Sequence, residues 1–203
     1  MKYLLGLAGS LLLGLVLTSQ SYAAVEADQI VRDTTDKVLA RVQSEKDVLR
    51  ADPGKMFRLV SELIFPHFDF AIMSQWVLGD HWKTADEAVR QEFVDQFRKL
   101  LVRTYATALL EFSDQEITYP EAENKGGTNT TVVRQQISQP GGSAIPITYR
   151  LHNRSGAWKV FDVSVDGVSL VKTYRASFGS MIKGGGLPGL VDSLASKNQA
   201  LTD

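Results

Sequence analysis

Residues 145–152 read Ile145-Pro146-Ile147-Thr148-Tyr149-Arg150-Leu151-His152, and this alternation of apolar and polar side chains decides the fold class. A period of two is typical of a β-strand with one buried face. Asn153 to Gly156 reads as a hairpin connection, and Trp158–Val165 reads as the next strand. A connection this short makes the two strands antiparallel. Both faces of Trp158–Val165 carry large apolar residues, so the pattern leaves its inward face open.

Two further strand signals lie upstream of this hairpin. Ile117 and Tyr119 alternate, and so do Val133, Gln135 and Ile137. Gly126-Gly127 and Pro140-Gly141-Gly142 supply turns between the segments. The sequence therefore predicts an antiparallel meander of about four to five strands.

Helices are expected before the meander. Residues 28–49 show helical apolar spacing, and a helix beginning at Asp52-Pro53 should stop before Pro66. Asp69 is the expected N-cap of a helix that ends at Gly79. Thr84-Ala85-Asp86-Glu87 matches a capping box and should open the longest helix, which carries an apolar stripe from Val89 to Phe112.

After the meander, Asp166-Gly167 turns the chain and Ser169 caps a helix that runs to Gly184. A last helix is expected over Leu187–Ala200. Helices on both sides of one short meander predict an α+β domain, a small antiparallel sheet covered by helices.

The first residues have the layout of a secretory signal peptide. Lys2 supplies a positive start, and Tyr3–Leu17 is an apolar run of 15 residues, shorter than the ~20 that span a bilayer. Ser21 and Ala23 are the small residues of a cleavage site before Ala24. We expect residues 1–23 to be a signal peptide and residues 24–203 to form one domain.

The composition argues against several kinds of chemistry. The formal net charge is −1, which disfavours nucleic-acid binding. Cysteine is absent, so neither a disulfide nor a thiolate nucleophile is available. The three histidines, His67, His81 and His152, are far apart and show no metal-ligand spacing. We therefore expect no metal and no cofactor.

Catalytic motifs are weak. Gly184 to Gly189 matches GxGxxG literally, but it follows a helix rather than a strand, so we interpret it as a helix end and a turn. No serine sits in a GxSxG elbow. Asp162 and Asp166 bracket a strand end near Tyr149, which leaves a proton-transfer or hydrolytic enzyme open as one alternative. An adaptor or chaperone with a solid core is the other.

Three stretches resemble the MlaC family of periplasmic phospholipid carriers, also described as toluene-tolerance auxiliary proteins. The first is Pro66–Met73 with Val77–Trp82, and the second is Phe93–Phe112. The third and most specific is Trp158–Val163 with Gly167–Val171, followed by Tyr174, Arg175 and Phe178. The match spans roughly residues 28–195, with the same order and spacing and a signal peptide.

This resemblance implies a monomeric carrier that works without catalysis or cofactor. It would move phospholipid across the periplasm and maintain outer-membrane lipid asymmetry, with the acyl tails between sheet and helices and the head group near solvent. The implied partners are the outer-membrane MlaA lipoprotein with its porin and the inner-membrane MlaFEDB transporter, met through MlaD.

A tail cavity of this kind should lie between the long helix and the sheet. Its expected wall residues are, from helices before the sheet, Met73, Phe97, Leu101, Tyr105 and Leu109; from the strands, Val133, Ile147, Tyr149, Val163 and Val165; and from the third motif, Val168, Leu170, Tyr174 and Phe178.

Overall fold

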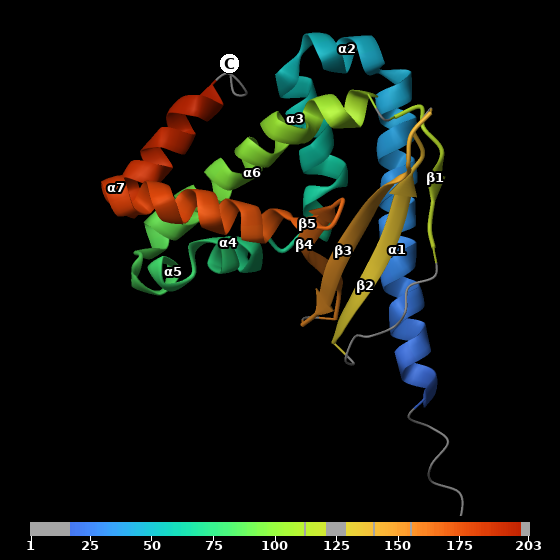
Figure 1. Cartoon of the computed structure of the whole chain (residues 1–203), viewed down its shortest axis with the longest axis horizontal. Helices are drawn as coiled ribbons and strands as arrows, with labels where there is room; N and C mark the ends of the chain where they lie inside the picture. Colours follow the sequence, from blue (N-terminus) through green and yellow to red (C-terminus); the bar gives the residue numbers. More distant parts are fainter. Residues whose placement is uncertain (1–16, 112, 121–128, 140, 155, 200–203) are drawn as a thin grey trace, which may run out of the picture.

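The strands form one antiparallel meander, as the computed structural model of the chain shows (Figure 1). The structure describes residues 17–199 apart from 112, 121–128, 140 and 155, and their side chains from residue 26 onward. The strands are β1 (Ile117–Thr118), β2 (Thr130–Ile137), β3 (Ile145–Asn153), β4 (Trp158–Val165) and β5 (Val168–Ser169). They lie in the order β1-β2-β3-β4-β5, which confirms the predicted α+β class. The expected turn at Gly126-Gly127 lies outside the described residues.

A β-bulge decides which face of β4 points inward. The register shifts between Arg150 and Leu151, so that Arg150 pairs with Asp162 but Leu151 pairs with Val160. Phe161 is the extra residue, and it points away from the inner face together with Asp162. Val160 and Val163 therefore both face inward, although strict alternation would place them on opposite faces.

The helices before the sheet follow the expected boundaries with one correction. A single helix over residues 28–49 is wrong, because α1 (Leu17–Ser44) ends and α2 (Lys46–Ala51) begins after Glu45. Asp52 caps α3 (Pro53–Leu63) by accepting a hydrogen bond from the Lys55 amide at 3.1 Å. The short 3₁₀ helix η1 (Phe65–His67) then leads toward the sheet, where the Asp69 amide donates to the Val160 carbonyl.

Asp69 also caps α4 (Phe70–Leu78), as expected, and α4 ends at Gly79 with a φ of 58°. The capping box at Thr84 is wrong. Thr84 is the last residue of α5 (Asp80–Thr84), and its hydroxyl donates to the His81 carbonyl. The long helix α6 (Glu87–Glu111) starts three residues later.

The C-terminal element α7 (Leu170–Asn198) consists of two helical segments that meet at Gly186. Ser169 is its N-cap, as predicted, and accepts from the Lys172 amide at 3.1 Å. The positive φ of Gly186, 70°, breaks the helix, and Pro188 lies at the start of the second segment. Figure 1 shows the change of direction within α7.

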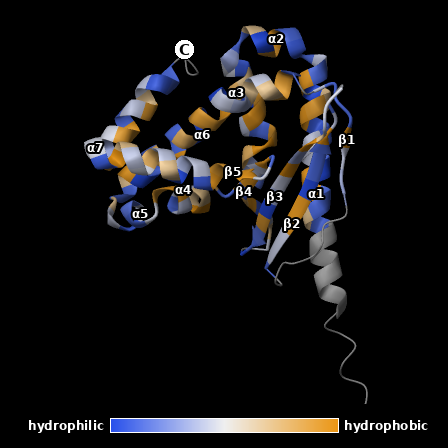
Figure 2. Cartoon of the chain, viewed as in Figure 1, coloured by the Kyte–Doolittle hydropathy of each residue, from blue (hydrophilic) through white to orange (hydrophobic). Residues whose placement is uncertain are grey.

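The interior is divided into three clusters of buried apolar residues. One joins α4, α6 and α7; a second joins α1 to the sheet; the third joins α1, α2, α3 and α6. Figure 2 shows hydrophobic residues concentrated where α3, α4 and α6 face the sheet. No helix within the described part of the chain is long and apolar enough to cross a bilayer.

Candidate functional site

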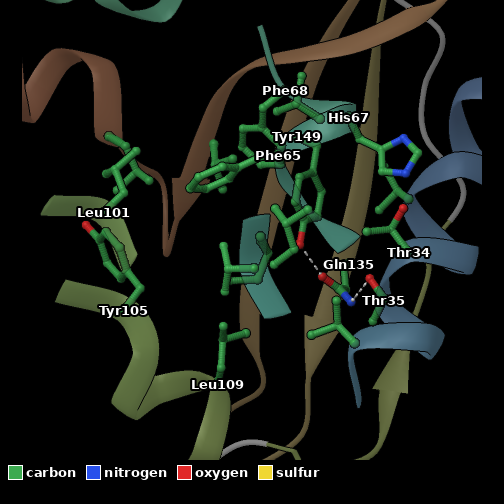
Figure 3. A pocket seen from close by; sticks show the side chains of 18 of the residues that line it. Thr34, Thr35, Phe65, His67, Phe68, Leu101, Tyr105, Leu109, Gln135 and Tyr149 are labelled. Atoms are coloured by element: carbon green, nitrogen blue, oxygen red, sulfur yellow. Dashed lines mark hydrogen bonds between the residues drawn. The ribbon is translucent and has the colours of Figure 1, made fainter. Parts of the chain in front are cut away.

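A cavity of about 290 Å³ lies where the three clusters meet (Figure 3). Its walls come from the inner face of the sheet and from α1, α3, η1, α4, α6 and the start of α7. Of its 28 lining residues only six carry a polar side-chain atom, and none is an aspartate, glutamate, lysine or arginine. Because an engineered apolar cavity of about 150 Å³ already admits benzene, this space is large enough for a sizeable hydrocarbon.

Nine of the fourteen residues expected from the sequence line this cavity. They come from four regions of the chain, namely Met73 of α4; Leu101, Tyr105 and Leu109 of α6; Ile147, Tyr149, Val163 and Val165 of the sheet; and Leu170 of α7. Alternation in β3 and the bulge in β4 together turn the sheet residues toward the helices. The predicted gap between the long helix and the sheet is therefore hollow.

Five of the expected residues lie outside the cavity wall. Phe97, Tyr174 and Phe178 belong to the α4–α6–α7 cluster, where Phe97 is fully buried and lies 5.2 Å from Tyr174 between ring centroids. They pack there because the first half of α6 faces α7, and only its second half faces the sheet. Val133 is covered by α1 in the sheet cluster, and Val168 at the β4–β5 turn is 60% exposed.

Residues from α1, α3 and η1 supply much of the wall, and the sequence analysis missed them. Those that face the cavity are, from α1, Ile30, Val31, Thr34, Thr35, Val38 and Leu39, and from α3 and its continuation, Val60, Ile64, Phe65, His67 and Phe68. Their helical spacing was visible in residues 28–64. It shows that each helix has an apolar face, but not that this face covers the sheet.

The polar groups of the wall gather mainly on the side of the cavity formed by α1, η1 and β2. The Tyr149 hydroxyl donates to Gln135 Oε1 at 2.7 Å, and Gln135 Nε2 donates to Thr35 Oγ1 at 3.3 Å (Figure 3). Gln135 is 3% exposed, so these bonds satisfy an amide that would otherwise be costly to bury. Burial also raises the pKa of Tyr149, which keeps its hydroxyl protonated and able to donate.

The opposite side of the cavity is hydrocarbon apart from Tyr105. Leu101, Tyr105 and Leu109 project from successive turns of α6, as Figure 3 shows. Burial is also the main cause that raises the pKa of Tyr105, so its hydroxyl stays protonated. The other α6 residues of the wall are aliphatic, so apart from the Tyr105 hydroxyl this side offers an apolar surface.

His67 is the one titratable imidazole of the wall among the described residues. Burial lowers its pKa, and the positive charges of Lys159 and Lys37 lower it further. The ring is therefore neutral at pH 7 and carries one N–H donor. It lies beside Thr34 of α1, as Figure 3 shows.

Asp162, one of the two acids on which the enzyme alternative rests, has a structural role. Asp162 is 2% exposed and accepts from Ser169 Oγ at 2.7 Å and from the Val171 amide at 3.2 Å. It fixes the start of α7 and does not line the cavity. Among the residues that the structure describes, no three His, Asp or Glu side chains are grouped so that they could hold a metal ion.

The inner face of a small meander and the surrounding helices enclose an apolar, uncharged cavity. This arrangement is that of a binding protein for a hydrophobic molecule. A family model described as MlaC protein matches residues 32–196, and the chain belongs to the MlaC family.

Two curated relatives agree with this family. The chain is 27% identical over 188 residues to the intermembrane phospholipid transport system binding protein MlaC of Haemophilus influenzae, covering 91% of this chain and 86% of that protein. It is 26% identical over 165 residues to toluene tolerance protein ttg2D of Pseudomonas putida, covering 81% and 76%.

A solved structure shows the same fold with a ligand. The phospholipid-binding protein of Ralstonia solanacearum, in complex with a phospholipid, superposes with a TM-score of 0.79 at 32% identity. The match covers 88% of this chain and 99% of that one.

Proposed function

We propose that this chain is a phospholipid carrier of the Mla system, which holds acyl tails in the cavity between sheet and helices. The observation that carries the proposal is the uncharged cavity at the meeting point of three apolar clusters. The phospholipid-binding protein of Ralstonia solanacearum, which has the same fold and was solved in complex with a phospholipid, supports it.

The energetics explain why such a carrier needs a cavity and no reactive group. A two-tailed phospholipid has about 30 methylene groups, so exposing its tails to water costs on the order of 20 kcal/mol. Moving the tails from a bilayer into an apolar cavity costs far less, because both surroundings are dry. Lipid crossing an aqueous gap therefore has to travel inside a protein.

Loading with phospholipid is the direct test. An organic extract of the purified protein should contain phospholipid, at about one molecule or more per chain, when it is analysed by mass spectrometry. The lipid-free protein should also extract phospholipid from vesicles. A protein that carries no lipid from cells with normal membranes and extracts none from vesicles would contradict the proposal.

The periplasm is the proposed compartment, reached through the signal peptide at residues 1–23. Support comes from the positive start, the apolar run and the small residues before Ala24. N-terminal sequencing of the periplasmic protein should begin at Ala24. Recovery of chains that still begin at Met1 in the membrane fraction would argue for an anchored protein instead.

The proposed partners are the MlaA–porin complex at the outer membrane and MlaD of MlaFEDB at the inner membrane, with lipid asymmetry of the outer membrane as the outcome. The family membership supports them. Site-specific crosslinking of the monomeric carrier in cells should capture both. Absence of either adduct, with the carrier still loaded with lipid, would remove that partner.

A further inference from the structure

The first segment of α7 carries charge of one sign only. Lys172, Arg175 and Lys183 are all exposed, and residues 170–185 contain no aspartate or glutamate. The whole chain has a formal net charge of −1, so this excess of positive charge is local. A local group of unbalanced cations attracts anionic partners to that part of the surface.

The three cations share one face of the helix, where they line an open groove. The other residues of this groove have small side chains and are Ala176, Gly179 and Ser180. Together the six positions recur at intervals of three and four residues, which is the spacing of a single stripe along a helix. Because the residues between them are small, the long cationic side chains are the outermost groups of the stripe.

An exposed tryptophan lies beside this stripe. Figure 1 shows α4 alongside the first segment of α7, and Arg175 Nη1 donates to the carbonyl of Trp76 on α4 at 3.4 Å. The guanidinium of Arg150 lies on the other side of Trp76, 5.7 Å from its ring centroid. Trp76 is 37% exposed, and an indole next to cations is typical of surfaces that meet the head groups of a bilayer.

Acidic residues border this surface without neutralising it. Asp80 follows Gly79, where an added Cβ would come within 3.0 Å of Arg175 Nη2, but Asp80 is paired with Lys83 at 2.8 Å. Asp166 is exposed at the β4–β5 turn. Among the described residues, no carboxylate forms an ion pair with any of the three α7 cations.

We propose that this α7 cationic face, formed by Lys172, Arg175 and Lys183 and bordered by Trp76 and Arg150, docks on the anionic surface of a phospholipid bilayer. Anionic lipids attract clustered lysines and arginines without requiring a particular arrangement of partner side chains. A protein partner would instead need apolar side chains for the core of its interface, and the stripe itself exposes none that are large.

The inference rests on the proposed carrier function and adds the surface with which the carrier meets a membrane. The two elements of this surface also reach the cavity. Leu170 of α7 and Met73 of α4 line the cavity, whereas Lys172 and Trp76, two and three residues further along, are exposed. Docking by this face therefore brings the bilayer next to elements that form the cavity wall.

Vesicle flotation measures this docking. The protein as purified is mixed with vesicles of phosphatidylcholine, either alone or with about 30% phosphatidylglycerol, and the fraction that floats is quantified. We expect at least about tenfold more protein on the anionic vesicles at low salt. The difference should shrink as salt is added, because ions screen exposed charges.

The triple variant Lys172→Ala/Arg175→Ala/Lys183→Ala should lose this binding by at least about tenfold. Its lipid load should stay unchanged, because none of the three residues lines the cavity. Lys172→Glu/Lys183→Glu is a second variant that keeps the contact of Arg175 with Trp76 and should lose the binding as well.

The matched control is Arg50→Ala/Lys55→Ala/Arg58→Ala, which removes the same charge from exposed positions of α2 and α3. It should float like the wild type. Brominated lipids in the anionic vesicles should quench tryptophan emission of the wild type, and Trp76→Phe should abolish most of this quenching.

Each contrary result overturns a defined statement. Wild-type binding by the α7 triple variant, or an equal loss in the α2–α3 control, would overturn the assignment to this face. A wild-type chain that fails to float with anionic vesicles at low salt would overturn bilayer docking and favour an acidic protein surface as the partner of this face. Mass spectrometry of lipid in the same preparation keeps the two proposals apart, since an unloaded chain that still floats contradicts only the carrier function.

Discussion

The α4–α6–α7 core and the cavity wall are both apolar, yet one is solid and the other hollow. In the core, four aromatic rings interlock, with ring centroids between 5.2 and 6.1 Å apart for the pairs of Phe97 with Phe93, Tyr174 and Phe178. In the wall, aliphatic side chains of the sheet face those of α1 and α6 across open space. The large planar groups of α6 and α7 fill the space between these two helices, whereas the aliphatic side chains of the sheet do not reach those of α1 and α6 across the cavity.

Phe97→Ala gives the largest expected effect of this contrast, because it removes a fully buried ring from the solid core. We expect the free energy of unfolding, measured in urea, to fall by about 3–5 kcal/mol. Lipid per folded molecule should stay unchanged. Leu101→Ala, one turn further along α6, should cost about 2 kcal/mol, since one side of Leu101 already faces open space. Equal costs for the two variants would remove the distinction between core and wall.

A charge placed in the wall should separate binding from folding. Leu109→Glu or Ile147→Asp puts a carboxylate beside the tails, where it is unpaired and dry. We expect lipid content to fall by at least about tenfold, a loss that corresponds to 1.4 kcal/mol of binding free energy. The thermal midpoint should fall less than that of Phe97→Ala, because the new group can reach water once the cavity is empty.

Ile147→Trp is the control for this pair, since it fills tail volume without adding charge and should also reduce the lipid load. Lipid content and thermal midpoint are measured on the same preparation. A midpoint that collapses while the surviving folded protein keeps its full lipid load would assign Leu109 and Ile147 to ordinary core.

Tyr149→Phe tests the polar side of the wall with a smaller change. It removes the hydroxyl that donates to Gln135 and leaves the ring in place. We expect the free energy of unfolding to fall by about 1 kcal/mol, because Gln135 loses one partner. Lipid content should be nearly unchanged. A tenfold loss of lipid here would show that the Tyr149 hydroxyl itself contacts the ligand.

Local chemistry explains which elements could be predicted from the sequence. Asp52, Asp69 and Ser169 were predicted as caps because a cap is decided by a few neighbouring residues, and all three accept the expected backbone hydrogen bond. The alternation in β3 was equally clear. The capping box at Thr84 failed because a competing short helix, α5, already ends at that residue.

The rest depended on tertiary contacts that a local pattern does not contain. The apolar stripe of α6 was visible in the sequence. The packing of α7 decides that the first half of this stripe contacts α7 and that its second half lines the cavity. The bulge at Phe161 could not be seen, because Phe161 is apolar and yet points away from the cavity toward Trp76. The contribution of α1 to the cavity wall was missed for the same reason. Its apolar face is visible in the sequence, but the sequence pattern does not indicate which surface this face covers.

Arg150→Ala should have the smallest effect and tests whether the two faces of the sheet act separately. Arg150 follows the cavity residues Ile147 and Tyr149 on β3 and precedes the buried Leu151, but its side chain points to the other face of the sheet. There its guanidinium lies 5.0 Å from the ring centroid of Phe161 and 5.7 Å from that of Trp76. Its nearest carboxylate oxygen, on Asp162, is 3.9 Å away, and its side chain is 44% exposed. Such partly exposed contacts contribute about 1 kcal/mol or less. We therefore expect a slightly lower thermal midpoint and an unchanged lipid load. If lipid were lost instead, the packing of Trp76 and Phe161 behind the sheet would have to control the cavity in front of it, and the sheet would couple two regions that this structure keeps apart.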